Sequence, residues 1–387
     1  MKNLLIRLRN YLNHQTLMAK KNILIFHSSN DLYGASKILL QVINLLKKDY
    51  VIHIFLPYNG PLDKTLSKQD IFLNYTDFGV LRKKYFSFWG ILNRTFKILV
   101  SVYTITRYIK RNKIDFIYTN TSLIVASGIS AFICKIPNYL HIHEIPDNKI
   151  YSTIMGILIS KFSLKIIVVS NSVKDYWSSH VKRPLELIYN GIPFNFKKRL
   201  IKKESKKIRF ITIARLLPYK GHKYIIEIAN QLLRLNLNAE FIFLGDIFKG
   251  YENYEKELKS IVTSNGITKN ILFKGFDPEI EKYLKSSDFL LHCAINPDPL
   301  PTVIFEAIQS NLPVIATNIG GAVEILDSGN GGLLISKNDS LKASRDILQY
   351  VKNTELVKKK NEYALNFINE NFSEETFNKK ILHFFSS

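Results

Sequence analysis

The fold is decided by residues 288–324, which read DFLLHCAINPDPLPTVIFEAIQSNLPVIATNIGGAVE. The apolar run Phe289–Ile295 predicts a buried strand, and Pro313–Thr317 predicts a second one. Between them lie a proline-rich loop, which carries Asp298, and a helical segment, which carries Glu306. Open parallel sheets hold ligands at such a loop, because the amides of the following helix point at whatever binds there. Ionised carboxylates in this place suit a hydroxyl-rich ligand, since each can accept hydrogen bonds from two neighbouring OH groups.

On both sides of this stretch, the chain alternates apolar strands with helical segments. The second half predicts strands near 208–214, 239–245, 271–274, 288–295, 313–317 and 331–335, and the first half predicts strands at 22–26, 51–56, 115–120, 139–143, 165–170 and 185–189. This alternation predicts an α/β protein with two Rossmann-like, doubly wound parallel-sheet domains that face each other across a cleft.

The lysine-rich segment 197–207, KKRLIKKESKK, breaks the hydrophobic pattern and predicts the domain boundary. We expect a basic N-terminal extension at 1–20, a first domain at 21–195, a second domain at 196–370 and a C-terminal helix at 371–387. This last helix is expected to cover a domain edge, either on its own domain or by packing back on the first one.

The composition is that of a globular protein. The 387 residues are 46% hydrophobic and 22% charged, and they leave room for two ordinary domains. Two cysteines predict no disulfide framework, and the N-terminus has no secretory pattern. The apolar run 96–106 is too short to span a bilayer, and Lys161 and Lys165 interrupt the next one at 150–170. We therefore expect a cytoplasmic protein.

The positive charge is large and uneven. The net charge is +22; residues 1–195 carry 26 Lys and Arg against 10 Asp and Glu, whereas the remainder carries 28 against 22. Such a one-sided field predicts an anionic partner, such as a membrane surface, nucleic acid or a phosphorylated substrate. A merely solubilising surface is the alternative. Nucleic acid is not expected, because no recognised binding module accompanies the charge.

Residues 81–113 concentrate this charge. They contain nine Lys or Arg, seven aromatic residues and no acid, in a helical pattern. Interleaved aromatic and cationic side chains suit the headgroup region of an anionic membrane, so we expect a peripheral protein on the inner face of the cell membrane. An ordinary sheet-covering helix is the alternative. Residues 1–13 can form a basic amphipathic helix or a frayed terminus.

Two further segments carry candidate ligand groups in the first domain. A polar loop follows the strand at 22–26 and leads through Gly34 into a helix, an arrangement that binds phosphate or uses glycine only for its conformation. His141 and His143 lie on the same face of the strand at 139–143. They lack a third ligand at suitable spacing, so no metal is expected.

In the second domain, Arg215 follows the first strand and Lys220 lies in the next loop. Two cations at the end of a strand can hold a diphosphate, Arg through its planar fork and Lys as a point charge. They could stabilise a departing nucleoside diphosphate without a metal, or they could belong to a solvated loop.

These motifs together resemble the retaining glycosyltransferases of family 4, which have the GT-B fold. The resemblance rests on Tyr33-Gly34-Ala35, His143-Glu144, Val169-Ser170-Asn171, Tyr189-Asn190-Gly191-Ile192, Arg215, Lys220-Gly221, Gly245, Gly275, Asp298-x7-Glu306-Ala307, Pro313-Val314-Ile315-Ala316 and Gly320-Gly321-x-x-Glu324. It runs from about residue 22 to the C-terminus, and the order of the motifs makes it specific.

The resemblance implies a role for each donor-binding residue. Arg215 and Lys220 would bind the diphosphate of the donor and stabilise it as it leaves. Glu306 would hold the ribose hydroxyls. Asp298 stands where the family has a Glu that contacts the transferred sugar, and it is one methylene shorter.

The remaining motif residues have implied roles around the same site. His143, with His141 as the alternative, would lie near the donor sugar and the reacting centre. Gly34 would let the first loop approach the phosphates or the acceptor. Gly320 and Gly321 would belong to the donor site, and Glu324 would contribute to it or only orient this glycine turn. The Asn190-Gly191 turn would border the cleft.

The implied reaction moves a sugar from a nucleotide-diphosphate sugar, with UDP ahead of GDP, to a saccharide or lipid-linked acceptor. Front-side attack with retention needs a positive diphosphate pocket and a dry cleft, and domain closure would assemble it. No cofactor is expected. The acceptor would serve surface polysaccharide or lipopolysaccharide assembly. An epimerase or phosphorylase of the same fold, or a non-catalytic basic adaptor, are the alternatives.

Overall fold

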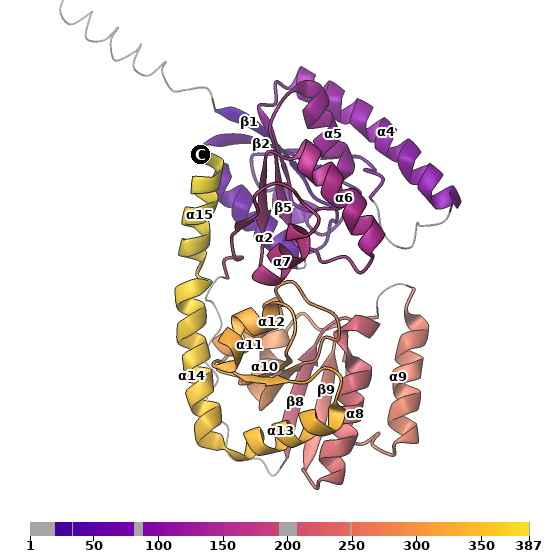
Figure 1. Cartoon of the computed structure of the whole chain (residues 1–387), viewed down its shortest axis with the longest axis vertical. Helices are drawn as coiled ribbons and strands as arrows, with labels where there is room; N and C mark the ends of the chain where they lie inside the picture. Colours follow the sequence, from indigo (N-terminus) through magenta and orange to yellow (C-terminus); the bar gives the residue numbers. More distant parts are fainter. Residues whose placement is uncertain (1–19, 33, 81–87, 193–206, 248–249, 387) are drawn as a thin grey trace, which may run out of the picture. The chain divides into compact units, whose positions relative to one another are not determined.

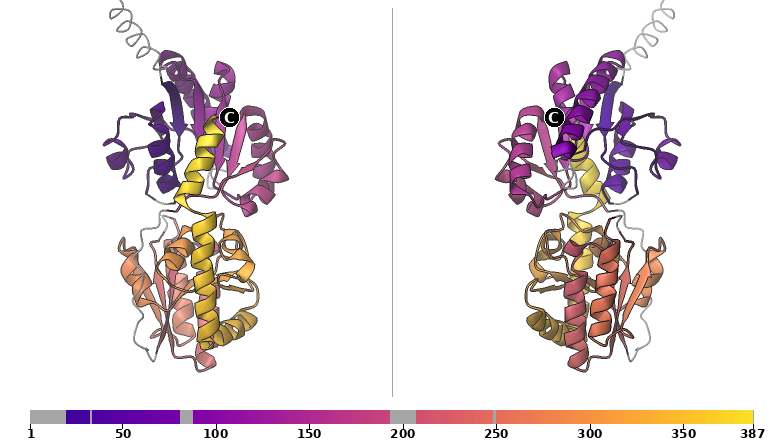
Figure 2. Two further views of the ribbon diagram at one scale, coloured as in Figure 1. Left: turned by 90° about the vertical axis from the view of Figure 1, so that its left-hand side faces the viewer. Right: turned by 90° about the vertical axis from the view of Figure 1, so that its right-hand side faces the viewer.

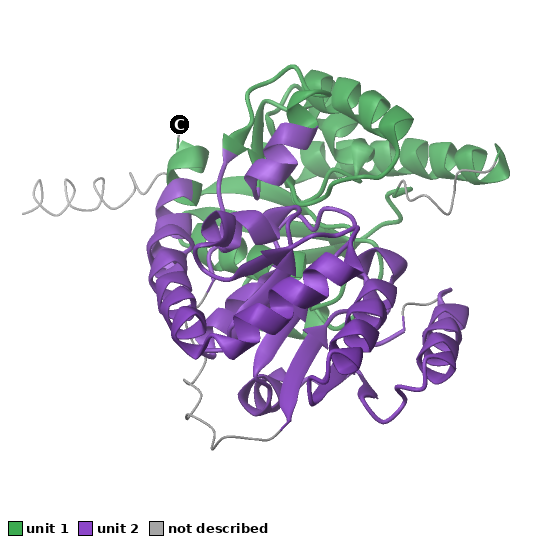
Figure 3. Ribbon diagram, turned by 60° about the horizontal axis from the view of Figure 1, so that its bottom comes forward, with its two compact units in different colours: residues 1–168, 177–186, 381–387 green, residues 169–176, 187–380 purple. Residues whose placement is uncertain are grey.

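The computed structural model describes residues 20–32, 34–80, 88–192, 207–247 and 250–386. The expected helix at 1–13, Tyr33, the first part of 81–113 and almost all of the lysine-rich segment lie outside these residues. The chain forms two compact units (Figure 3). Unit 1 comprises Met1–Val168, Trp177–Glu186 and Ile381–Ser387, and unit 2 comprises Val169–Tyr176 and Leu187–Lys380.

The sheet of unit 1 has the strand order β3-β2-β1-β4-β5-β6-β7. Its strands are β1 Lys21–Phe26, β2 Tyr50–Leu56, β3 Phe72–Tyr75, β4 Phe116–Thr119, β5 Asn138–Ile142, β6 Lys165–Val168 and β7 Glu186–Leu187. The neighbours from β3 to β6 all pair in parallel. The continuous apolar run of β1 suits such a sheet, because Ile23–Phe26 is buried completely beneath helices on both faces.

The helices of this half of the chain are α2 Gly34–Leu46, α3 Asp63–Leu66, α4 Phe88–Arg111, α5 Val125–Cys134, α6 Lys149–Phe162 and α7 Asn171–Ser178. α5 packs against both α4 and α6, and the three helices form one group in Figure 1. Ile105 and Ile109 of α4 join Leu24 and Phe26 of β1 in one hydrophobic core. α4 is therefore a sheet-covering helix along its C-terminal half.

The sheet of unit 2 is also parallel, with the order β10-β9-β8-β11-β12-β13. Its strands are β8 Ile208–Ile213, β9 Ala239–Leu244, β10 Ile271–Gly275, β11 Phe289–His292, β12 Val314–Thr317 and β13 Leu333–Ile335. The helices are η2 Pro218–Lys220, α8 His222–Arg234, α9 Glu252–Ser264, α10 Ile280–Ser286, α11 Thr302–Gln309, α12 Gly321–Ile325, η3 Asp327–Gly329, α13 Ser340–Lys352, α14 Thr354–Asn371 and α15 Glu374–Ser386. The two views of Figure 2 place α14, in yellow, on one side of unit 2 and α8 and α9 on the other.

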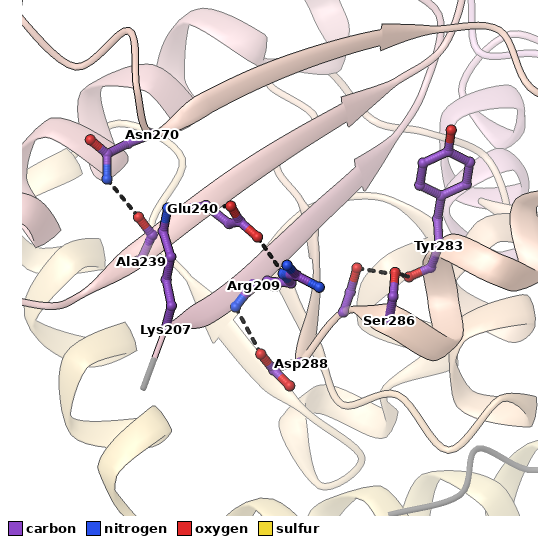
Figure 4. Close-up of polar contacts among 9 residues, drawn as sticks. Lys207, Arg209, Ala239, Glu240, Asn270, Tyr283, Ser286 and Asp288 are labelled. Atoms are coloured by element: carbon purple, nitrogen blue, oxygen red, sulfur yellow. Dashed lines mark hydrogen bonds and ion pairs between the residues drawn. The ribbon is translucent and has the colours of Figure 1, made fainter. Parts of the chain in front are cut away.

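The starts of the unit 2 strands are tied together by polar contacts (Figure 4). Arg209 of β8 forms an ion pair with Glu240 of β9, and Nζ of Lys207 lies 3.3 Å from the same carboxylate. Although partial burial raises the pKa of Glu240, the hydrogen bonds from these two cations lower it overall. The amide of Arg209 donates to Asp288 at 2.8 Å, and Nδ2 of Asn270 donates to the carbonyl of Ala239 at 2.8 Å. These contacts hold together the N-terminal ends of the strands. The candidate site lies at their C-terminal ends.

Two parallel, doubly wound sheets confirm the predicted fold class. The strand expected over Phe289–Ile295 is shorter than predicted and ends at His292. The chain turns away there, and the amide of Ile295 donates to the carbonyl of Tyr219 at 2.9 Å instead of extending the ladder. The strand β3 was not predicted, because it is a four-residue edge strand whose side chains are only partly buried.

The end of the chain lies in both units. Ile381–Ser387 belongs to unit 1, where the rings of Phe384 and Phe385 contact Tyr139 at centroid distances of 5.6 and 5.7 Å. In the parts of the chain that the structure describes, none of the helices combines the length and hydrophobicity that a membrane span needs.

Candidate functional site

Each sheet has a point at which the strand order reverses, between β1 and β4 in unit 1 and between β8 and β11 in unit 2. Ligands of open α/β sheets bind beyond the C-terminal ends of the strands at these points. Arg215 and Lys220 follow β8, and Asp298 follows β11, so these three predicted residues flank the reversal in unit 2. His143 follows β5, the neighbour of β4 in unit 1.

Lys220 and Asp298 contact each other. Nζ of Lys220, at the end of η2, forms an ion pair with Oδ2 of Asp298, and the two side chains are only 19% and 15% exposed. Burial alone would lower the pKa of Lys220, but the carboxylate of Asp298 reverses this effect and raises it. Burial would raise the pKa of Asp298, but Lys220 brings it below its ordinary value. Both groups are therefore charged at neutral pH, and each partly cancels the charge of the other.

His292, the last residue of β11, completes this cluster. Its Nε2 lies 3.6 Å from Oδ2 of Asp298. Burial lowers the pKa of His292 to about 4, although Asp298 opposes this shift. The imidazole is thus neutral at pH 7, and an uncharged ring lies beside the ion pair. Sequence reasoning missed His292, because it lies inside a run that indicated only a buried strand.

The loop that carries Asp298 is held by close backbone contacts with glycines. A Cβ atom on Gly320, whose φ is +65°, would lie 2.7 Å from the backbone of Asp298, and the amide of Gly321 donates to the carbonyl of Asp298 at 2.8 Å. A Cβ on Gly221, whose φ is +78°, would lie 1.8 Å from the carbonyl oxygen of Cys293. Gly320 and Gly321, predicted as donor-site residues, therefore support the Asp298 loop directly.

Arg215 and Glu306 lie on either side of this cluster in the chain. The backbone around Arg215 is fixed by bonds from Ala214 N to Leu244 O, at 3.0 Å, and from Leu216 N to Asp246 O, at 2.9 Å. Glu306 is a half-buried residue of α11, a helix whose other side is anchored in the core. Both side chains thus stand on rigid backbone.

A small hollow lies next to Leu216, the residue that follows Arg215, at the C-terminal ends of β8, β9 and β10. Its lining includes Leu216, Phe243, Gly245, Asp246, Phe273 and Gly275. Sequence reasoning noted only the two glycines, as motif members, and missed the hollow because it forms from three separate strands.

Glu324 holds the start of α7. Its carboxylate accepts hydrogen bonds from the amides of Asn171 and Ser172, at 2.7 and 2.9 Å, and from the hydroxyl of Tyr189 at 3.0 Å. The carboxylate thus satisfies two amides at a helix N-terminus, where a negative charge is stabilised. Three motifs that are far apart in the sequence meet at this one residue.

Gly191, of the predicted Asn190-Gly191 turn, packs against α15. A Cβ on Gly191 would lie 2.6 Å from Cβ of Phe377 and 3.0 Å from Cα of Glu374. The structure therefore explains this glycine by close helix packing.

In unit 1, polar side chains gather at the ends of β1, β4 and β5. Nδ2 of Asn120 lies 3.2 Å from Nδ1 of His27, and Oδ1 of Asn120 lies 2.9 Å from Nε2 of His143. The rings of His141 and His143 are tilted by 36° to each other, and their centroids lie 4.1 Å apart. His141 is fully buried, whereas His143 is half-buried and retains surface that a ligand could contact. Gly34 begins α2, next to this cluster in the chain.

Burial keeps these imidazoles neutral. It lowers the pKa of His27 to about 4 and that of His141 to about 3. Burial, together with the two neighbouring imidazoles, places the pKa of His143 well below 6.5. Glu144 fixes the backbone after β5, because its carboxylate accepts from Ser122 N at 3.1 Å, from Ser122 Oγ at 2.9 Å and from His143 N at 3.2 Å. Sequence reasoning missed His27 and Asn120, whose signal was a polar residue directly after a strand.

Within the described residues, no cluster of three or more His, Cys, Asp or Glu side chains could hold a metal ion.

Comparison with known protein families assigns almost the whole chain. The family described as "Glycosyltransferase Family 4" matches residues 34–196, and the family described as "Glycosyl transferases group 1" matches residues 193–367. The chain is a family 4 glycosyltransferase. It is 26% identical over 308 residues to the capsular polysaccharide biosynthesis glycosyltransferase CapH of Staphylococcus aureus, covering 74% of this chain and 78% of CapH.

Two further similarities fit this assignment. The chain is 24% identical over 273 residues to the UDP-Gal:alpha-D-GlcNAc-diphosphoundecaprenol alpha-1,3-galactosyltransferase of Escherichia coli, covering 64% of this chain and 68% of that enzyme. The crystal structure of Anabaena HepE in complex with UDP and glucose matches with a TM-score of 0.78 at 23% identity, over 94% of this chain and 99% of HepE. The fold of this family 4 glycosyltransferase is thus the GT-B fold that the motifs implied.

Proposed function

We propose that this glycosyltransferase moves a sugar, with retention of configuration, from a UDP-sugar to a hydroxyl of a saccharide or lipid-linked acceptor in surface polysaccharide assembly. The observation that carries the proposal is the Lys220–Asp298 ion pair at the β8/β11 reversal, next to Arg215. A diphosphate needs the two cations, and a sugar hydroxyl needs the carboxylate.

We assign each part of the donor to different residues of unit 2. Arg215 and Lys220 bind the diphosphate and stabilise its charge as the bond to the sugar breaks. Glu306 accepts hydrogen bonds from the ribose hydroxyls, and Asp298 accepts from the transferred sugar. The hollow next to Leu216 takes the uracil base, which its aromatic and glycine lining can contact.

The chemistry needs no protein nucleophile. The acceptor hydroxyl attacks the anomeric carbon from the side of the leaving group, the bond from that carbon to the phosphate oxygen breaks, and the departing phosphate takes the proton of the hydroxyl. The cations of Arg215 and Lys220 offset the charge on UDP without a metal ion. Asp298 holds Lys220 fully charged, which supports this role.

The named relatives support the choice of donor and acceptor. HepE is described in complex with UDP and glucose, and the Escherichia coli relative is named for a UDP-sugar donor and a diphosphoundecaprenol acceptor. CapH is named for capsular polysaccharide biosynthesis. We extend these properties to this chain as a proposal, with UDP preferred over GDP.

The exposed side of α4 supports a membrane location. Its exposed side carries an apolar stripe at intervals of three or four residues, formed by Phe88, Leu92, Phe96, Leu99 and Tyr103. The same line continues into the exposed cations Arg107, Lys110 and Arg111. Monomeric soluble proteins rarely expose so continuous an apolar surface. We propose that the stripe lies in the headgroup region of an anionic membrane on its cytoplasmic side.

Charge favours a membrane over a second copy of the chain as the occupant of the stripe. Arg82, Lys83 and Lys84 precede α4, three cations follow the stripe, and residues 78–114 contain no acid. Two copies packed stripe to stripe would bring like charges together in either orientation.

The test is a thermal-shift panel of UDP-, GDP- and ADP-sugars on the full-length protein, followed by transfer assays with the donors that bind. A ligand at one hundred times its Kd stabilises the folded protein by about 2.7 kcal/mol. We expect the largest shift with a UDP-sugar, and an α-linked product by NMR. Equal shifts with all nucleotides would contradict the choice of UDP. Product formed without an acceptor would identify an epimerase, and phosphate-dependent cleavage of a glycan would identify a phosphorylase.

A further inference from the structure

A hydrogen-bonded chain of buried and half-buried side chains ends at His143, and its contacts fix which atoms carry the protons. We call it the histidine network; its members are His27, Asp31, Ser36, Tyr118, Asn120, His141 and His143. Asn120 lies at its centre, at the β1/β4 reversal of unit 1, and is 1% exposed.

The orientation of the Asn120 amide is fixed by the backbone. One end of the amide lies 3.3 Å from the carbonyl oxygen of Ala35. A carbonyl oxygen can only accept, so this end must be the NH₂ group. The oxygen of the amide therefore points the other way, where the hydroxyl of Tyr118 lies at 3.0 Å and Nε2 of His143 at 2.9 Å.

This orientation places the proton of His143. Oδ1 of Asn120 has no hydrogen, so both of its neighbours must donate to it. His143 therefore carries its proton on Nε2. The hydroxyl of Tyr118 uses its only hydrogen on Asn120, so Nδ1 of His141, at 2.7 Å, must donate to Tyr118.

The other side of the amide places the proton of His27. Nδ2 of Asn120 donates to Nδ1 of His27 at 3.2 Å, so the neutral ring carries its proton on Nε2. That proton is donated to Oγ of Ser36 at 2.9 Å, and Ser36 donates to Oδ1 of Asp31 at 3.0 Å. One amide group thus sets the tautomers of two histidines.

This tautomer determines what the second ring nitrogen of His143, Nδ1, can bind. A neutral ring with its proton on Nε2 has an unprotonated Nδ1, which can only accept. In the described part of the chain, Nδ1 of His143 has no hydrogen-bond partner, and the ring is half-buried. A hydroxyl group is the donor that such a nitrogen fits, and the substrates of a glycosyltransferase are rich in hydroxyls.

We infer that Asn120 is a positioning residue for sugar transfer, which holds His143 in the Nε2–H tautomer so that Nδ1 accepts a hydrogen bond from a sugar hydroxyl. The inference rests on the proposed function. Asn120 acts entirely through His143 and needs no contact with the substrate.

The test compares histidine tautomers and kinetics. Long-range ¹H–¹⁵N spectra of the full-length protein with ¹⁵N-labelled histidine, at pH 7, report which nitrogen carries the proton, and His143→Gln assigns the signals. The wild type should show His143 as the Nε2–H tautomer. In Asn120→Leu, which keeps the size but not the acceptor, His143 should become a mixture of tautomers. The kcat for transfer should fall at least tenfold, while the Kd for UDP stays unchanged.

Two other variants make the result decisive. Asn74→Leu makes the same change elsewhere in unit 1, where Asn74 donates to Tyr108, and should leave the His143 signal as it is. Asn120→Asp keeps the acceptor for His143 but removes the donor to His27. It should therefore preserve the His143 tautomer and move a proton to Nδ1 of His27. If Asn120→Leu does not fold, Asn120→Asp serves as the test.

An Nδ1–H tautomer of His143 in the wild type would overturn the inference, as would an unchanged tautomer in Asn120→Leu or a lost one in Asn120→Asp. Failure of the wild type to transfer sugar from any UDP-sugar would instead remove the proposed function. The NMR spectra report the tautomer of His143 independently of the rate of sugar transfer.

Discussion

The carboxylate of Asp298 forms an ion pair with Lys220 and is also proposed to accept a hydrogen bond from a hydroxyl of the transferred sugar. Its side chain is one methylene shorter than that of the Glu in the family motif. The ion pair also means that binding of a diphosphate must compete with Asp298 for Lys220.

This competition predicts opposite effects of Asp298→Asn on binding and on transfer. Without the carboxylate, UDP no longer competes with an anionic side chain for Lys220, so the Kd for UDP should fall about fivefold, which is about 1 kcal/mol. Transfer should slow at least tenfold because the sugar loses its acceptor. Calorimetry with UDP and a transfer assay measure the two effects. Asp346→Asn, which changes the same charge on α13, should alter neither. Weaker UDP binding by Asp298→Asn would contradict the competition.

The buried imidazoles predict a stability change with pH. His27 and His141 have folded pKa values of about 4 and 3, below the value of about 6.5 in an unfolded chain. Between these values the unfolded state binds more protons, so the stability is complete above pH 6.5 and is lost as the pH falls below it. Each histidine accounts for about 1.4 kcal/mol per pH unit.

His141→Phe should therefore reduce the stability lost between pH 7 and pH 5 by about 2 kcal/mol, from the same linkage. Urea unfolding at the two pH values measures this difference, with the exposed His383→Phe as the control. An equal loss in the wild type and His141→Phe would show that His141 does not remain neutral in the folded protein.

At the scale of elements, the two faces of α4 lie in different environments. Ile105 and Ile109 anchor its C-terminal half in the core of unit 1, while the apolar stripe faces outward. The sequence of 81–113 indicated both a sheet-covering helix and a membrane-facing one, and the structure shows that the covering interpretation describes one face. The membrane-facing interpretation stays a prediction for the other face.

Vesicle flotation tests the stripe. The full-length protein should float with vesicles that contain anionic lipid, and less so at high salt because screening weakens the attraction of its cations. Phe96→Ser with Leu99→Ser should reduce the bound fraction at least fivefold. Phe276→Ser, at another exposed apolar residue but in unit 2, should leave it unchanged. A bound fraction that changes neither in the Phe96→Ser, Leu99→Ser variant nor at high salt would refute the proposed surface.

α7 depends on a carboxylate from a different element. Glu324→Ala leaves the amides of Asn171 and Ser172 without their acceptor, at a cost of about 1 kcal/mol that is typical of a lost helix cap. Hydrogen exchange of the first turn of α7 should quicken severalfold. Asp339→Ala removes the cap of α13, whose Oδ1 accepts from Lys342 N, and should quicken only α13. Unchanged exchange in α7 would show that Glu324 does not hold it.

At the scale of the whole molecule, sequence reasoning recovered what depends on periodicity and missed what depends on side-chain pairing. Both parallel sheets followed from alternating apolar runs, which a parallel sheet requires. The pairing of Lys220 with Asp298 did not follow, since 78 positions separate them and only the adjacency of β8 and β11 brings them together. The same holds for Asn120 and His27, which meet because β1 and β4 are neighbours.

The proposed function requires that the strand ends at the β8/β11 reversal bind the donor diphosphate. Isothermal titration of UDP into the full-length wild type, Arg215→Ala and the control Arg345→Ala on α13 tests it most directly. We expect Arg215→Ala to weaken binding at least thirtyfold, about 2 kcal/mol, because a charge-assisted contact to phosphate is lost. Arg345→Ala should bind UDP like the wild type. Equal affinity of Arg215→Ala and the wild type would show that the diphosphate does not bind at these strand ends.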